Sequence, residues 1–156
     1  MRNMTTLDGT LWGAFPTVEI RICDGQPELQ EAQALAALSA SLAARIVRAY
    51  DEGEPVVYQP HRLIEENTWR AIRYGLSGEL IDLDRGDVLP ARARIERLVD
   101  WVVPVAEEIG AAPYLAIPER NVAERQIARS EEGWSLREIF AEQVAATAAV
   151  RAVGSS

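Results

Sequence analysis

Two charged residues in an alternating segment are the first candidates for chemistry. Glu19 and Arg21 stand two positions apart in T-V-E-I-R-I-C, which runs from Thr17 to Cys23. In an extended strand such residues share a face and lie about 7 Å apart. A carboxylate there can ligate Mg²⁺, and a guanidinium can bind phosphate or carboxylate oxygens. The same spacing is typical of a solvated outer face with a cross-strand ion pair, and on spacing alone that second interpretation is favoured.

The segment that carries both residues is the clearest strand in the sequence. Val18, Ile20 and Ile22 alternate with the charged residues, which predicts one apolar face and one charged face. A lone strand cannot satisfy the hydrogen bonds of its own edges. We therefore expect its sheet partners either in the first fifteen residues or on sequence outside this chain.

The remainder of the sequence predicts a mostly helical chain of α+β class. Apolar residues three and four positions apart predict helices over residues 27–50, 62–74 and 91–109. A small hairpin is expected between residues 79–83 and 87–89, around Asp84-Arg85-Gly86. Two short helices follow, each opened by the spacing of a capping box: Asn121 with Glu124, and Ser135 with Glu138.

Composition excludes several classes of function. The 156 residues carry 16 basic and 24 acidic side chains, and this net charge of −8 argues against nucleic-acid binding. All the basic residues are arginine, so Schiff-base and P-loop lysine chemistry is excluded within the chain. Cys23 and His61 are single, which excludes an internal disulfide and a multi-histidine metal site. No apolar run suits a membrane span and no signal peptide is recognisable, so we expect a cytoplasmic location.

Three blocks of sequence stand in a characteristic order. They are P-T-V-E-I-R-I-C-D-G-Q (16–26), the alanine-rich L-Q-E-A-Q-A-L-A-A-L-S-A-S-L (29–42) and E-N-T-W-R-A-I-R-Y-G-L-S-G-E-L-I-D (66–82), with Arg125-Gln126 further on. In order and spacing they resemble the C-terminal part of the type 2 glutamate–cysteine ligases, the YbdK-like carboxylate–amine ligase family. The resemblance places residues 16–152 in the ligase-like region of a single partial domain, preceded by an irregular segment over residues 1–15.

The resemblance implies a fold and a reaction. The fold is that of the glutamine-synthetase-type catalytic domain, an antiparallel sheet backed by helices. The reaction couples ATP cleavage, with Mg²⁺, to amide formation in glutathione biosynthesis. The γ-carboxylate of glutamate becomes an acyl phosphate, and an amine such as that of cysteine attacks it. The enzyme contributes positioning and charge neutralisation.

The resemblance also implies roles for five residues. By position Glu19 resembles a Mg²⁺-binding carboxylate, and Arg21 resembles the arginine that steadies the phosphoryl group or the substrate carboxylate. Asn67 and Arg70 lie three apart on one helix face and Arg73 continues the stripe, so we expect Arg70 to act in catalysis and Asn67 and Arg73 to bind the nucleotide. A helix-surface pair between Arg70 and Glu66 is the simpler alternative, and we expect Trp69 to be a packing residue.

The chain also departs from the family pattern. Family members are more than twice as long, and their glutamate-rich N-terminal strand has no counterpart in residues 1–15. The family's Trp-Asp-x-Arg-Pro strand is replaced by Trp12 followed by Gly13-Ala14-Phe15. Two functions therefore remain open: a ligase that needs an N-terminal half on another chain or a homo-oligomer, or a non-catalytic interaction or regulatory remnant. In neither case do we expect a nucleic-acid or membrane partner.

Overall fold

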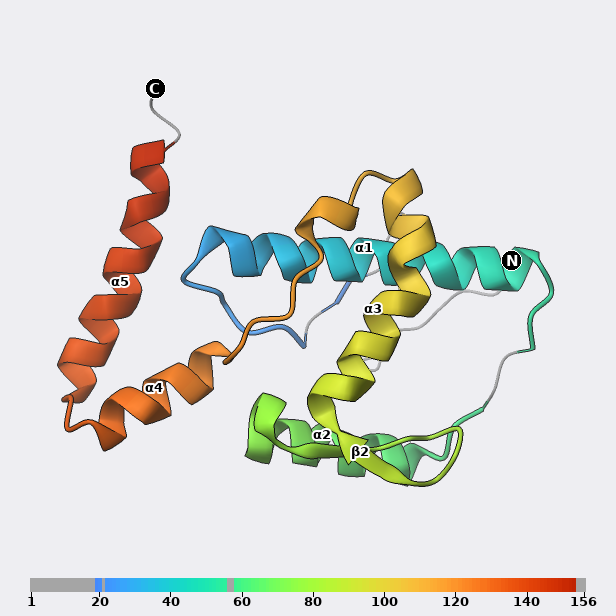
Figure 1. The fold of residues 1–156 in the computed structure, drawn as a ribbon, viewed down its shortest axis with the longest axis horizontal. Helices are drawn as coiled ribbons and strands as arrows, with labels where there is room; N and C mark the ends of the chain where they lie inside the picture. Colours follow the sequence, from blue (N-terminus) through green and yellow to red (C-terminus); the bar gives the residue numbers. More distant parts are fainter. Residues whose placement is uncertain (1–18, 21, 56–57, 154–156) are drawn as a thin grey trace.

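The structure is a computed structural model that describes residues 19–20, 22–55 and 58–153, the last four of them by their backbone alone. Its elements follow one another as α1 (Leu29–Asp51), α2 (His61–Tyr74), η1 (Gly75–Ser77), β1 (Glu79–Ile81), β2 (Val88–Pro90), α3 (Ala91–Glu108), η2 (Ala112–Tyr114), α4 (Val122–Glu131) and α5 (Leu136–Val153). Figure 1 shows a mostly helical molecule with one small hairpin. The predicted α+β class and the predicted hairpin are both confirmed.

The predicted strand over residues 17–23 does not form at the positions that the structure describes. Residues 19, 20, 22 and 23 belong to no helix or strand, while Thr17, Val18 and Arg21 lie outside the described residues. Ile22 is 92% exposed. A strand needs a neighbour to accept and donate its backbone hydrogen bonds, and β1 pairs only with β2 among the described strands. The prediction was wrong at these positions because it rested on local alternation alone, whereas a strand also needs a neighbouring strand to form.

The core lies where α1 crosses α3 (Figure 1). On α1 the buried residues are small: Ala34, Ala37 and Ser41 recur at spacings of three and four. They face a side of α3 on which Val102 and its neighbours are buried. Small residues let two helix backbones approach closely, which is how this crossing forms a core although it buries few large side chains.

The hairpin is held to α2 by a side chain. β1 and β2 pair antiparallel, with Leu80 opposite Leu89. The Asn67 amide on α2 then bonds the backbone of Ile81 in both directions: Nδ2 donates to the carbonyl at 2.9 Å, and Oδ1 accepts from the N–H at 2.7 Å. Asn67 thus takes the place of a neighbouring strand at the free edge of β1, which fixes α2 across the hairpin.

The end of α2 and the start of α4 meet at Gly75. This residue follows the last turn of α2 with φ of 60°, a conformation that favours glycine. A Cβ at this position would lie 2.6 Å from Oε1 of Glu124, so the contact also needs the absence of a side chain. Glu124 in turn closes the capping box of α4 with Asn121, as the spacing predicted.

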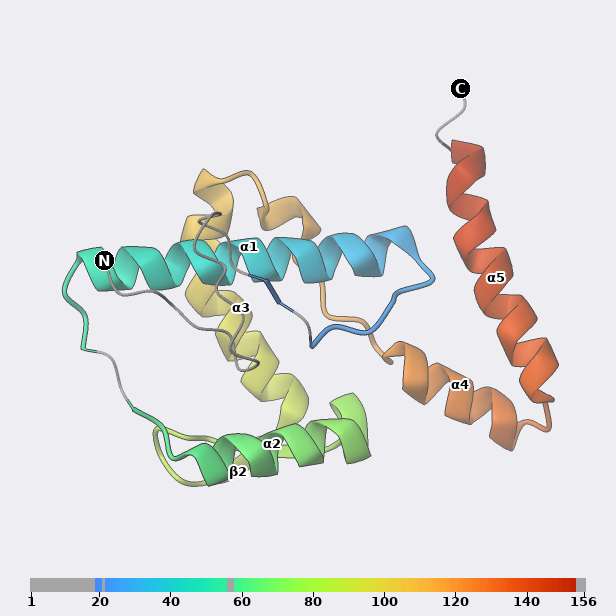
Figure 2. The same ribbon diagram turned by 180° about the vertical axis from the view of Figure 1, so that it is seen from behind.

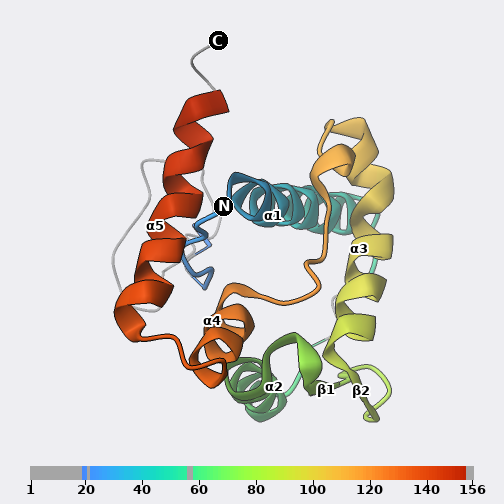
Figure 3. The same cartoon turned by 60° about the vertical axis from the view of Figure 1, so that its left-hand side comes forward.

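The last two helices form a hairpin of their own. Ser135 and Glu138 exchange hydrogen bonds at the start of α5, which confirms the second predicted capping box. Figure 3 shows α4 and α5 beside the beginning of α1. Thr147 on α5 donates its hydroxyl to the Pro27 carbonyl at 3.2 Å. Among the helices that the structure describes, none is both long and apolar enough to cross a membrane.

Candidate functional site

The predicted site residues divide between two places in the fold. Glu19 lies exposed in the segment before α1, and Arg21 lies outside the described residues. Asn67, Arg70 and Arg73 lie together on α2. The pairing of Glu19 with Arg21 therefore stays a prediction.

Asn67 is engaged on the inner side of α2. Its amide oxygen and nitrogen are both bonded to the backbone of Ile81. The side chain is half-buried against β1. Both of its polar atoms are therefore used within the protein, and its position in this structure suits orienting α2. Its predicted role in nucleotide binding stays a prediction.

Arg70 forms the local pair that the sequence offered as the simpler alternative. Its Nε donates to Oε1 of Glu66 at 2.8 Å, one helical turn away. The remaining guanidinium nitrogens of Arg70 have no hydrogen bond to another described residue. Arg70 is thus oriented by Glu66 and retains donors for an anion.

Arg73 and Trp69 lie with Tyr74 at the exposed end of α2. The Arg73 guanidinium is 5.7 Å from the centroid of the Tyr74 ring, and the Trp69 and Tyr74 rings meet edge to face at 5.6 Å. Trp69 is nevertheless 53% exposed, so within this chain it packs on one side only. Its ring contact among the described residues is with Tyr74, and the packing role of Trp69 stays a prediction.

A buried carboxylate that sequence reasoning left without a role lies beside the hairpin. Asp82 accepts hydrogen bonds from the backbone N–H groups of Asp84 and Arg85, and Arg97 donates to its second oxygen at 3.0 Å. Burial raises the pKa of Asp82, but these two N–H groups and the nearby guanidinium groups of Arg94 and Arg97 outweigh it and lower the pKa below its ordinary value. Asp82 is therefore an anchor of the hairpin turn, held as a carboxylate.

A second carboxylate joins α2 to α4. Oε1 of Glu124 accepts from the backbone N–H and the hydroxyl of Ser77, both at 3.1 Å, and Oε2 accepts from the N–H of Asn121 at 2.9 Å. Burial raises the pKa of Glu124, but these hydrogen bonds more than compensate and lower it. The spacing of Asn121 and Glu124 in the sequence predicted the contact between these two residues. No sequence pattern indicated the contact of Glu124 with Ser77, 47 residues away.

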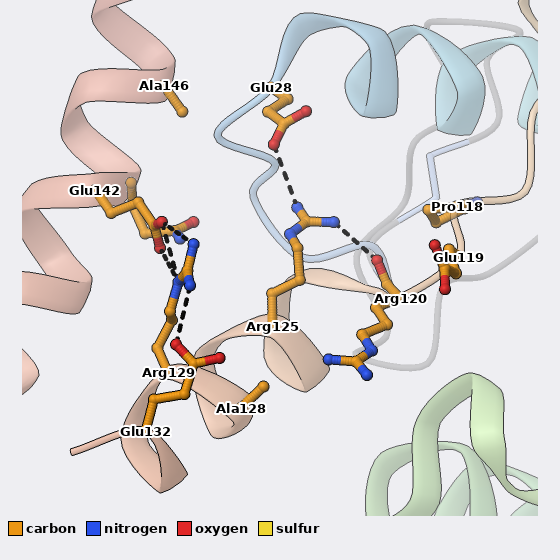
Figure 4. A pocket seen from close by; sticks show the side chains of 11 residues that line it. Glu28, Pro118, Glu119, Arg120, Arg125, Ala128, Arg129, Glu132, Glu142 and Ala146 are labelled. Carbon is orange, nitrogen blue, oxygen red and sulfur yellow. Dashed lines mark hydrogen bonds and ion pairs between the residues drawn. The ribbon is translucent and has the colours of Figure 1, made fainter. Parts of the chain in front are cut away.

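A pocket of about 510 Å³ lies between α4, α5 and the loop before α1 (Figure 4). Charged side chains are prominent in its lining: Arg125 and Arg129 face it from α4, and glutamates lie on the other walls. Arg129 donates to Glu142 at 2.8 Å and to Glu132 at 3.0 Å, and these hydrogen bonds raise its pKa. Three arginines and four glutamates line the pocket, so its walls offer a phosphate no net positive charge.

The described residues do not fit Mg²⁺ by themselves. Over residues 19–20, 22–55 and 58–153, no three His, Cys, Asp or Glu side chains come together in a group that could hold a metal ion. Mg²⁺ takes about six oxygen ligands in near-octahedral geometry. Glu19 alone is at most one of them.

Comparison with known proteins shows which family the chain resembles. The model of glutamate-cysteine ligase family 2 matches residues 2–149. A protein of Frankia alni is 38% identical over 123 residues, 79% of this chain and 32% of its own length. A protein of Solibacter usitatus is 36% identical over 130 residues, 80% of this chain and 34% of its own length.

A third relative, from Leifsonia xyli, is 37% identical over 135 residues, 82% of this chain and 35% of its own length. All three bear the name "Putative glutamate--cysteine ligase 2", that of Frankia alni with a further copy number. The chain thus spans about a third of the length of these curated relatives. No solved structure matches it.

Proposed function

Because the chain belongs to glutamate–cysteine ligase family 2, we propose that it is one part of an ATP-dependent carboxylate–amine ligase. The family match over residues 2–149 is the observation that supports this most directly. In the proposed reaction ATP phosphorylates the γ-carboxylate of glutamate, and an amine such as that of cysteine displaces phosphate to form the amide. The remaining two thirds of the family chain complete the site, either on the same polypeptide or on another, in the cytoplasm.

The proposed roles follow from the charges of the reaction. Phosphoryl transfer develops negative charge that cationic donors stabilise. Arg70 is suited to this because Glu66 orients its guanidinium and leaves further N–H donors available. We assign Arg21 the same task from its position in the sequence. Arg73 is assigned to the nucleotide and Asn67 supports it by fixing α2 on the hairpin.

The ions and substrates belong to the completed enzyme. Mg²⁺ is assigned to Glu19 together with oxygen ligands from outside the described residues. In this proposal the residues of α2 supply donors, and the part of the ligase that the chain does not span supplies the other metal ligands. ATP, glutamate and the amine are the only partners besides that part.

A non-catalytic interaction module is the second candidate function. It is favoured by the observation that Asn67 and Arg70 are already bonded within the chain and that no metal-binding group forms among the described residues. Under this alternative the same surface binds a partner protein and no ADP is ever formed.

One experiment separates the two functions. The chain is incubated with ATP, Mg²⁺, glutamate and cysteine, alone and after co-expression with the part of the Frankia alni protein that it does not match. ADP release and γ-glutamylcysteine are both measured. The proposal predicts product only in the co-expressed sample.

Matched variants make the result specific. Glu19→Ala and Arg21→Ala are expected to abolish product, whereas Glu131→Ala and Arg62→Ala, which change exposed residues of the same types, leave it unchanged. Product from the chain alone would show that the site is complete without the rest of the ligase. Absence of product in both samples would favour the non-catalytic module.

A further inference from the structure

Helix α2 has two unlike sides. Its half-buried residues, Leu63, Glu66, Asn67 and Arg70, recur at spacings of three and four and face the hairpin. No residue of α2 is fully buried, so this helix is covered on one side only. At 100° per residue the opposite side is made by the residues that lie between them.

That opposite side, called here the outer face of α2, is apolar over its second half. It contains Ile64, Thr68, Trp69 and Ile72, with Ala71 at its edge, all of them exposed, while Glu65, which pairs with His61 at 3.4 Å, lies on the same side nearer the start of the helix. Ile72 is 81% exposed, the most of the three large apolar residues on this face. Thr68 does not break the pattern, because its hydroxyl already donates to the Ile64 carbonyl at 2.9 Å and needs no other partner.

Nothing in the described part of the chain covers this face. Figure 2 shows α2 in front of the hairpin and α3, with no described helix or strand over it. The packing of α2 agrees, since most of it is against β1 and the adjoining turn η1. Soluble proteins rarely leave contiguous apolar patches uncovered unless a partner binds there.

The length of the relatives identifies what covers it. The curated relatives share this segment but are about three times longer, since the chain covers 32% to 35% of three of them. We infer that the outer face of α2 is the docking surface for the rest of the ligase. This inference rests on the proposed function, in which the chain needs that remaining part to complete the enzyme. The complementary surface on the rest of the ligase is an apolar patch.

A co-expression experiment tests the inference without any substrate. The tagged chain is produced together with the part of the Frankia alni protein that it does not match, and both are isolated through the tag. Hydroxyl-radical footprinting then compares oxidation of Trp69 in the complex and in the chain alone. We expect the two parts to co-purify, and the oxidation of Trp69 to fall severalfold in the complex.

Two matched substitutions locate the surface. Ile72→Glu introduces a charge on the outer face and is expected to lower co-purification about tenfold or more, because a charge buried at an interface is costly. Ile127→Glu makes the same change at an exposed isoleucine of α4 and is expected to leave co-purification within about twofold. Both variants should fold, since neither position is in the core, and circular dichroism checks this.

Each other result overturns the inference. These results are failure to co-purify, equal oxidation of Trp69 with and without the partner, equal effects of the two substitutions, and protection of Trp69 by raising the concentration of the chain alone, which would mean that a second copy covers it. The proposed function fails separately: a complex with protected Trp69 that releases no ADP supports the docking and contradicts the ligase. ADP release without protection of Trp69 supports the ligase and contradicts docking at the outer face of α2.

Discussion

Arg125 on α4 binds Glu31 on α1 with both arms of its guanidinium, at 2.6 and 2.8 Å, across 94 positions of the sequence. Glu31 is the more buried partner, with 14% of its side chain exposed. The hydrogen bonds with Glu31 raise the pKa of Arg125. Among the side-chain contacts that join the α4–α5 hairpin to α1, this is the one with two parallel charge-assisted hydrogen bonds.

Removing that contact should loosen the hairpin formed by α4 and α5. We expect Arg125→Ala to lower the free energy of unfolding by about 1–2 kcal/mol, since it leaves Glu31 without its partner. Arg125→Lys should recover only part, because an ammonium cannot reproduce the fork. Urea unfolding measures both, with Arg137→Ala, an exposed arginine of α5, as control. Equal midpoints for Arg125→Ala and the control would contradict the assignment.

The two hydrogen bonds between the Asn67 amide and the Ile81 backbone lead to a second prediction. Asn67→Ala removes the one described side chain that bonds the free edge of β1 at Ile81, and should cost about 1–3 kcal/mol in urea unfolding. The matched change is Thr68→Ala, one residue away on the exposed side, which should cost less than about 0.5 kcal/mol. If the two substitutions cost the same, the Asn67 bonds do not hold α2 to the hairpin.

Acid should weaken the hairpin through Asp82. Its pKa in the folded chain lies below the ordinary value of 3.8, so the folded state binds this proton less readily than the unfolded state. The stabilisation is therefore complete above about pH 5 and is lost as the pH falls through the ordinary value and then the lowered folded pKa. Urea unfolding at pH 7 and pH 3 measures the loss, to which Glu124 and Glu138, whose pKa values are also lowered, contribute.

Asp82→Asn tests the share of that one carboxylate. The variant keeps the shape and one acceptor but cannot lose a charge, so its stability should fall less between pH 7 and pH 3 than that of the unaltered chain. Asp100→Asn, on the exposed side of α3, should reproduce the unaltered pH dependence. Parallel stability curves for Asp82→Asn and the unaltered chain would remove Asp82 from the acid response.

Gly75 offers a steric test of the junction between α2 and α4. Gly75→Ala places a Cβ 2.6 Å from Glu124 Oε1 in a backbone conformation with φ of 60°, and should cost about 1–3 kcal/mol. Gly133→Ala is the control, because its φ of 93° carries backbone strain while a Cβ there meets nothing within 4 Å. The excess cost of Gly75→Ala, read from thermal unfolding, is the steric part. No excess would mean that Glu124 moves aside freely.

Local patterns predicted most of the secondary structure. Helix α2 was expected over residues 62–74 and spans His61–Tyr74, and both capping boxes form. These features depend on residues within one or two helical turns, which the sequence displays directly. The pair of Arg70 with Glu66 belongs to the same class, since partners four positions apart meet on any helix.

The features that failed or were missed depend on distant partners. The alternation around Glu19 predicted a strand, but a strand exists only beside another, and the described residues supply none there. Glu31 gave no sign that it would meet Arg125, and Ser77 none that it would meet Glu124. The candidate site depends on distant partners in the same way, because no three His, Cys, Asp or Glu side chains of the described residues form a metal-binding group.

The Glu124 carboxylate couples the end of α2 to the start of α4. It closes the first turn of α4 on Asn121 and at the same time holds Ser77 just past the end of α2. Fraying of that first turn withdraws both bonds together, so the two ends open in one cooperative event and not as independent termini. In native-state hydrogen exchange the amide hydrogens of Ser77 and Asn121 would then be lost through the same opening, at matching opening free energies, although 44 positions of sequence separate them.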